Sequence, residues 1–241
     1  MHIYWASVFI LPKRIIQELE ERMRKFLWSQ GNNIKGKAKV NWKSVCMPKT
    51  EGGLGIRRVV DMNNALMATH IWSLLSNRES LWVKWVHSYH IQDRSFWEIP
   101  VKSNISWSWR KLLSLRPLIR DYVWTKVGDG TKTFVWFDKW DNICPISMFI
   151  TPRRISNAGF RMNTKLAEVY IHGEWRWPIA WINQFAVLNS LRDMELASNR
   201  HDELVWRSRL GVESEFNTAL VWDDIRQSQN EVSWANLVWF P

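Results

Sequence analysis

Apolar residues in the first 120 positions recur with the spacing of α-helices. Between residues 13 and 28 they return every three or four positions, which places them along one face of a helix. The same spacing follows Asp61 to about residue 75, covers residues 80–89, and resumes after Ser106 until Pro117 interrupts it. Asp and Ser favour helix N-termini, because their side chains accept hydrogen bonds from free backbone N–H groups. The pattern predicts a helical N-terminal half.

The second half mixes short β-prone runs with further helical stretches. The segment "YVWTKVGDGTKTFVWFDKW" sets two such runs around Gly128-Asp129-Gly130, which indicates a β-hairpin near residues 122–138. The expected fold class is therefore mainly α with a small antiparallel β insertion (α+β). Beyond the hairpin we predict helices at 163–171 and 178–196, a short strand at 203–207, and a last helix from Asn217 to about 226.

The composition is that of a globular chain without a membrane span. Hydrophobic residues make up 46% and charged residues 23% of the 241 positions, and no run approaches the roughly 18 apolar residues of a transmembrane helix. The opening apolar stretch follows no basic segment, so we expect no signal peptide. Cys46 and Cys144 stand alone, and His87 and His90 lack further ligands at zinc-site spacing. Neither a disulfide framework nor a metal site is expected.

The formal charge of +10 is concentrated in the first half of the chain. Residues 1–120 hold 20 Lys/Arg against 8 Asp/Glu, whereas residues 121–241 hold 13 against 15. The densest stretch, residues 22–50, has eight basic residues and no acidic one. Such an asymmetry favours a polyanionic partner for the first half. The alternative is a solvated basic surface without a specific partner.

Two glycine-rich stretches raise the question of a nucleotide site. The stretch "EGGLGI" at 51–56 and the stretch "GDGTKT" at 128–133 both lack the glycine spacing of a P-loop or a dinucleotide-binding loop. We expect these glycines to serve positions that need a positive φ or a close backbone approach. No nucleotide cofactor and no small-molecule substrate is predicted.

Seven segments occur here in the order in which similar ones occur in another group of proteins. The chain resembles plant-type LINE (non-LTR retrotransposon) reverse transcriptases over essentially its whole length. Seven ordered motifs make this resemblance far more specific than any single glycine loop. The segments are "YWASVFILPKRIIQELEERMRKFLW", "KVNWKSVCMPKTEGGLGIR", "NNALMATHIWSLL", "SLWVKWV", "SWSWRKLLSLRPLI", "VGDGTKTFVWFDKW" and "VSWANLVWFP".

The resemblance implies a position downstream of the polymerase palm. Residues 1–30 correspond to the end of the thumb, residues 31–200 to a tryptophan-rich linker region, and residues 201–241 to the start of the reverse transcriptase zinc-binding domain. The family's Cys and His ligands follow that point, so we expect no zinc in this chain. The parent would be an RNA-directed DNA polymerase that uses Mg²⁺ and works in the nucleus; the location of this chain is left open.

No catalytic residues are predicted. Two-metal nucleotidyl transfer needs a set of carboxylates, which the family supplies from an early Asp and a Tyr-x-Asp-Asp turn. The nearest counterpart, Asp223-Asp224, falls in a predicted helix at the wrong end of the chain, where we expect an exposed acidic face. Asp129, Asp138 and Asp141 allow a nuclease interpretation, but Asp129 beside Gly130 is typical of a turn and the other two follow a strand end.

The predicted contact site lies around the "EGGLGI" bend. A bend there would bring the lysines before it and the arginines after it to one surface, with a tryptophan between them for base stacking. Such a surface would bind RNA or DNA through the backbone, largely without sequence preference. The alternative is a degenerate retroelement remnant, or a segment that packs on the missing palm and has no independent activity. The predicted nucleic-acid-binding residues are Lys35, Lys37, Lys39, Trp42, Lys43, Arg57 and Arg58.

Overall fold

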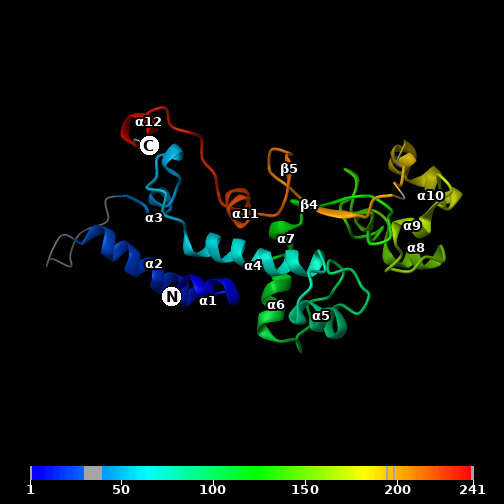
Figure 1. The fold of residues 1–241 in the computed structure, drawn as a ribbon, viewed down its shortest axis with the longest axis horizontal. Helices are drawn as coiled ribbons and strands as arrows, with labels where there is room; N and C mark the ends of the chain where they lie inside the picture. Colours follow the sequence, from blue (N-terminus) through cyan, green and yellow to red (C-terminus); the bar gives the residue numbers. More distant parts are fainter. Residues whose placement is uncertain (1, 30–39, 194, 198, 240–241) are drawn as a thin grey trace. The chain divides into compact units, whose positions relative to one another are not determined.

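The computed structural model describes residues 2–29, 40–193, 195–197 and 199–239. It confirms the predicted fold class: the chain is mainly helical with small antiparallel sheets (Figure 1). The described residues form two compact units. The first unit comprises residues 2–29, 40–70, 106–115 and 217–239, and the second comprises the described residues of 71–105 and 116–216.

The first unit is built from helices, as the apolar spacing predicts. Helix α4 begins in this unit, and its last residues, 71–75, belong to the second. The caps predicted at Ser106 and Asn217 are present, since Ser106 Oγ accepts from Trp109 N and Asn217 Oδ1 accepts from Ala219 N. The cap predicted at Asp61 is wrong, because α4 begins at Val59 and Asp61 lies in its first turn. The elements are α1 (His2–Val8), α2 (Lys13–Trp28), α3 (Trp42–Val45), η1 (Lys49–Glu51), α4 (Val59–Leu75), α6 (Trp107–Ser114), α11 (Thr218–Ile225) and α12 (Ala235–Val238).

Asn63 on α4 ties the N-terminal segment to the rest of the first unit. Its side chain is buried, donates to Ala6 O at 2.7 Å and Phe9 O at 2.8 Å, and accepts from Leu11 N at 2.8 Å. These bonds satisfy the backbone groups freed where α1 ends, which would otherwise be costly to bury. One side chain thereby fixes the turn between α1 and α2.

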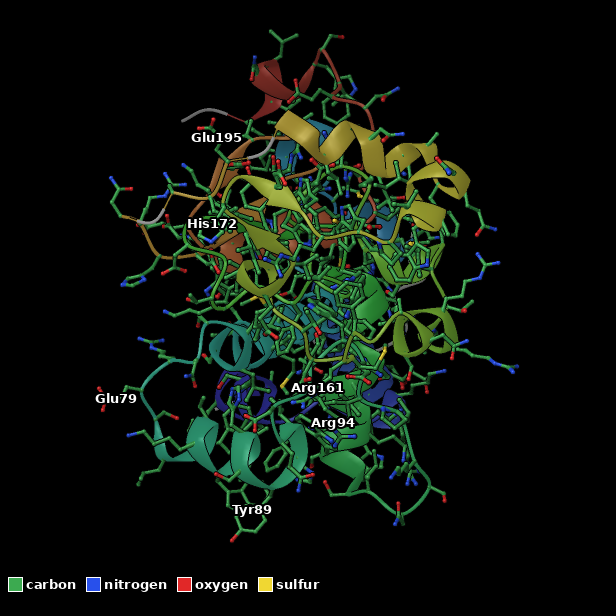
Figure 2. The ribbon with its side chains drawn as sticks, turned by 90° about the vertical axis from the view of Figure 1, so that its right-hand side faces the viewer. Glu79, Tyr89, Arg94, Arg161, His172 and Glu195 are labelled. Atoms are coloured by element: carbon green, nitrogen blue, oxygen red, sulfur yellow. The ribbon has the colours of Figure 1, made fainter. Side chains whose placement is uncertain are left out.

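The second unit combines short helices with two small sheets. The helix predicted over residues 80–89 is present as α5, which Ser80 caps, and a π-helical turn follows it. Tyr89 projects from this turn with 67% of its surface exposed (Figure 2). The elements are α5 (Leu81–Val86), η2 (His87–Ile91), α7 (Arg116–Ile119), β1 (Val123–Lys126), η3 (Ile146–Met148), α8 (Pro152–Asn157), α9 (Leu166–Val169), β2 (Tyr170–Ile171), β3 (Glu174–Trp175), α10 (Ile179–Gln184), η4 (Ala186–Asp193), β4 (Glu203–Arg207) and β5 (Glu213–Ser214).

Tryptophans dominate the core of the second unit. Trp136 is fully buried and its ring lies 5.9 Å from that of Trp177 and 6.2 Å from that of Trp181. Trp140 stacks on Trp175 at 5.8 Å. Each buried indole removes a large apolar area from water. For these residues the interpretation of the tryptophans as core is confirmed.

The hairpin predicted near residues 122–138 is wrong. β1 pairs antiparallel with β4, with Val123 opposite Trp206 and Lys126 opposite Glu203. The segment after Gly130 contributes an isolated bridge from Phe134 to Lys165 rather than a returning strand. A two-residue hairpin turn needs its central residues in special conformations, but here the loop is drawn to a distant carboxylate instead. The strand predicted at 203–207 is present as β4 and becomes the partner.

The division into regions 1–30, 31–200 and 201–241 follows the resemblance and stays a prediction. The compact units divide the chain elsewhere, because β4 pairs with β1 and residues 217–239 join the first unit. Within the described ranges no helix is long and apolar enough to cross a membrane. No group of three or more His, Cys, Asp or Glu side chains in those ranges is placed to hold a metal ion.

Candidate nucleic-acid interface

The "EGGLGI" stretch is a tight bend, and its glycines are there for backbone reasons. Gly52 ends η1 with φ 84°, a left-handed conformation that glycine adopts without strain. A Cβ on Gly53 would lie 2.0 Å from Met47 O, so no other residue fits there. Leu54 N and Gly55 N then donate to Val45 O and Met47 O, which returns the chain onto α3. The expectation of positive φ and close approach is confirmed at these two glycines.

The bend is fixed by the C-terminal segment, which Figure 1 draws beside α3. Glu51 accepts from both terminal nitrogens of Arg226, at 2.9 and 2.5 Å, and both side chains are buried. The Glu51 carboxylate raises the pKa of Arg226. Val232 N also donates to Thr50 O at 2.9 Å. Sequence reasoning missed this ion pair, because no local spacing links two residues so far apart in the chain.

Lys43, Arg57 and Arg58 lie on the two sides of this bend and gather near one tryptophan. Lys43 and Arg58 line the same small pocket, together with Trp222 and Arg226. The Arg57 guanidinium lies 4.8 Å above the Trp222 ring, and that of Arg226 lies 5.1 Å from it. Lys35, Lys37 and Lys39, which precede Lys43 in the sequence, lie outside the described residues.

Two of these cations are paired with carboxylates, and two are not. Arg58 lies 3.8 Å from the Asp61 carboxylate, and Arg226 is held by Glu51 and Asp223. Lys43 and Arg57 are exposed, and among the described residues neither forms an ion pair. Cations without a carboxylate partner keep their full charge for a phosphate. The candidate interface therefore centres on Lys43 and Arg57.

Trp42 does not stand among these cations as a stacking platform. It is only 8% exposed and packs with Val45 and Cys46 against the end of α2, in particular Met23 and Leu27. A buried indole cannot receive a base, so Trp42 is removed from the contact set. Trp222, which the sequence did not single out, is the aromatic ring between the guanidinium groups.

Three of the carboxylates considered for catalysis, Asp129, Asp138 and Asp141, each accept hydrogen bonds from nearby groups. Asp129 accepts from Thr131 N and Oγ1 and from His201, and these bonds lower the pKa of Asp129 to about 2. Asp138 accepts from Phe134 N and Asp141 from Ile143 N, as in turns. The turn interpretation is confirmed for Asp129. The strand end expected before Asp138 and Asp141 is absent, because this segment forms only an isolated bridge at Phe134.

The expected acidic face on the last helix holds only in part. Asp223 is 60% exposed and bonded to Arg226, whereas Asp224 is buried at 8% exposure. The reason is that α11 turns the Asp224 side of the helix toward the interior of the first unit, where Val221 is also buried.

The "GDGTKT" loop is occupied by a carboxylate of the chain itself. Asp202 accepts from the backbone N–H groups of Gly128, Gly130, Lys132 and Thr133, and also from Thr133 Oγ1, at 2.7–3.0 Å. Converging N–H groups form an anion-binding nest, but here Asp202 fills it. The loop therefore offers no phosphate cradle.

Comparison with known proteins supports a retrotransposon-related protein. The chain is 30% identical over 254 aligned positions to the Arabidopsis thaliana protein named "Putative ribonuclease H protein At1g65750", covering 99% of this chain and 40% of that relative. It is also 30% identical over 139 positions to the Arabidopsis thaliana "Uncharacterized mitochondrial protein AtMg00310", covering 57% of this chain and 90% of that relative. The chain belongs to the family of this mitochondrial protein.

The chain spans less than half the length of one of these relatives. It covers about 40% of the length of the relative with the ribonuclease H name. No protein-family model matches the chain, and no solved structure matches it. The finer assignment therefore rests on the ordered motifs and on the geometry of the bend.

Proposed function

We propose that this chain is a non-catalytic region of a LINE-type RNA-directed DNA polymerase that contacts template RNA or target DNA through its basic surface. The seven ordered motifs and the relatives above support the retroelement part of this proposal. The proposed contact residues are Lys43 and Arg57, and we add to them Lys35, Lys37 and Lys39 of the preceding connection, which lies outside the described residues.

The observation that carries the proposal is the unpaired state of Lys43 and Arg57 at the bend. Exposed cations that lack a carboxylate gain most from phosphate, because the contact releases counterions from the nucleic acid. Phosphate contacts position a protein on a strand without reading bases. The surface should therefore bind RNA or DNA largely without sequence preference.

We further propose that the chain performs no chemistry by itself and needs no cofactor. Nucleotidyl transfer requires carboxylates that share two metal ions. Among the carboxylates weighed for that role, Asp129, Asp138 and Asp141 accept hydrogen bonds in turns, and Asp223 forms an ion pair with Arg226. Primer extension on an RNA template by the purified chain with Mg²⁺, lost in Asp223→Ala, would contradict this.

A second candidate function is packing against a protein surface, such as the palm of the parent polymerase. A specific observation favours it: an apolar groove of about 350 Å³ in the first unit. Trp5 and Phe9 on its rim are 52% and 41% exposed. The groove is lined by Trp5, Phe9, Ile10, Leu11, Pro12, Ile15, Leu19 and Trp107.

A charge-removal pair separates the two candidates. The variant Lys43→Gln/Arg57→Gln removes the two unpaired cations, and the control Lys13→Gln/Arg14→Gln removes two exposed cations at the start of α2. Two lost phosphate contacts should weaken binding to single-stranded RNA by about tenfold or more near 0.1 M salt. The control should lose less than about threefold. Equal losses, or no RNA binding by the wild type, would favour the protein-packing candidate.

A further inference from the structure

The second unit contains a cavity of about 620 Å³ that the proposed function does not use. Its walls come from the end of α4, the turn after η2, the "GDGTKT" loop and the start of β4. A cavity of this size matches the clefts that hold one small ligand. The lining includes the aromatic side chains of Trp72, Phe96, Trp97 and Phe134.

The loop on one side of the cavity is held in place from within. Asp202 binds four backbone N–H groups of residues 128–133, which leaves Thr131, Lys132 and Thr133 along the wall. Because those N–H groups are used, the loop does not recognise a phosphate. Recognition in this cavity must come from side chains.

Two charged side chains face the cavity without pairing with each other. Lys165 Nζ donates to Lys132 O at 2.8 Å and lies 2.9 Å from the centre of the Phe134 ring, so one of its three donors remains beyond these two contacts. Asp138 Oδ2 accepts from Phe134 N at 2.8 Å, which leaves lone pairs on both oxygens. The described ion pairs include none between Asp138 and Lys165. The cavity thus offers one donor group and one acceptor group beside aromatic rings.

Burial of Lys165 and Asp138 beside the cavity disfavours the charged form of each side chain and so shifts the pKa of both. Burial lowers the pKa of Lys165 to about 8 and raises the pKa of Asp138 to about 6. Both are still charged near pH 7. The opposite charges of the two groups offset only part of this cost, since burial is the largest cause of both shifts, and a ligand that hydrogen-bonds to both groups would offset more of it.

We propose that this cavity binds a single unpaired nucleobase, guanine in preference to the others. The Watson–Crick edge of guanine carries two adjacent N–H donors beside a carbonyl oxygen. A carboxylate can accept from both donors while an ammonium donates to the oxygen, which assigns the donors to Asp138 and the oxygen to Lys165. Adenine, cytosine and uracil each offer only one donor group on this edge. The Arg120 guanidinium lies over the Trp97 ring and the Lys165 ammonium over the Phe134 ring, so recognition rests on the edge of the base rather than on stacking.

The inference goes beyond the proposed function, because it concerns a different unit and a base rather than the backbone. The base could belong to a free guanine nucleotide or to an unpaired residue of a strand. Titration with guanosine monophosphate tests the first source, and titration with an oligothymidine carrying one central guanine tests the second. Binding to either, with at least about tenfold preference over the adenine counterpart, supports the proposal.

The decisive variant is Asp138→Asn. Its amide keeps an oxygen to accept from Phe134 N, so the turn is preserved, but it now also offers a donor. Guanosine monophosphate affinity should fall at least about tenfold, and xanthosine monophosphate, which has a carbonyl where guanine has its amino group, should gain. A merely structural role for Asp138 would not exchange one ligand for the other.

The matched control is Asp141→Asn, which also alters a carboxylate that accepts from a turn N–H but does not line this cavity. It should bind guanosine monophosphate like the wild type, and Lys165→Gln should weaken that binding. Calorimetric titration measures all four proteins. No guanine preference in the wild type with either ligand, or equal losses in Asp138→Asn and Asp141→Asn, would overturn the proposal.

Discussion

At the scale of single residues, Asp138 is the most informative side chain. Its folded-state pKa of about 6 lies above the ordinary value of 3.8, because burial disfavours the carboxylate. The charged groups that face it are Arg120, Lys165 and Asp202. Between pH 4 and pH 6 the folded protein therefore binds more protons than the unfolded chain. The contribution of this carboxyl to stability is present below pH 4 and is lost as the pH rises through 6.

Because the ionisation of Asp138 destabilises the folded protein, its removal should change how stability depends on pH. Asp138→Asn cannot titrate, so the free energy of unfolding of the variant should rise relative to that of the wild type as the pH goes from 4 to 7. Urea unfolding, followed by tryptophan fluorescence at several pH values, measures the difference. A constant difference between Asp138→Asn and the wild type across that range would contradict the burial of an ionised Asp138.

At the scale of elements, the bend at residues 48–55 is the part on which the interface depends. Gly53→Ala places a Cβ where Met47 O already lies, so the bend must open. Gly159→Ala is the control: it carries the cost of a positive φ (84°), which Gly53 does not have, but nothing lies within 4 Å of the new Cβ. The left-handed conformation alone costs about 1 kcal/mol.

We therefore predict that Gly53→Ala lowers the free energy of unfolding by clearly more than Gly159→Ala, by about 2 kcal/mol or more. It should also weaken RNA binding, because Lys43 and Arg57 stand on opposite sides of the bend. Urea unfolding and filter binding on both variants provide the comparison. Equal costs in the two variants would mean that the close approach at Gly53 is relaxed in solution.

The elements also show what the sequence could and could not predict. The helices capped by Ser80, Ser106 and Asn217 form as predicted, because cap and apolar spacing act within a few residues of each other. The hairpin failed because the loop after β1 is held by Asp202, far along the chain. The helix predicted at 178–196 divides into α10 and η4, and that predicted at 163–171 shortens to α9.

The candidate site, like the fold, was predictable only where the signal is local in the sequence. The gathering of Lys43 with Arg57 and Arg58 follows from a glycine bend, which is a local signal. The Glu51–Arg226 pair and the place of Trp222 could not be predicted from a local signal. Arg226 and Trp222 belong to a segment about 170 residues further along the chain. Trp42 was misassigned for the same reason: its neighbours on α2 cover it, and one sequence does not say which tryptophan in a basic stretch is covered.

At the scale of the whole molecule, charge and aromatic groups are divided between the units. The first unit's sequence holds 15 of the 33 Lys/Arg and only 8 of the 23 Asp/Glu, and the second unit is closer to neutral. The second unit carries the tryptophan core and the proposed base pocket. We infer a division of labour in which the first unit holds the backbone of a strand and the second accepts a base.

The most direct test of the central claim, that basic residues around the bend grip nucleic acid, is a salt series of filter binding. It compares the wild type with a variant in which Lys35, Lys37, Lys39 and Lys43 are changed to Ala. The control changes four lysines elsewhere that are exposed: Lys13, Lys84, Lys102 and Lys126. Loss of four phosphate contacts should flatten the slope of log affinity against log salt by up to about 4. The account predicts that flattening for the first variant and a nearly unchanged slope for the control; equal flattening in both would contradict it.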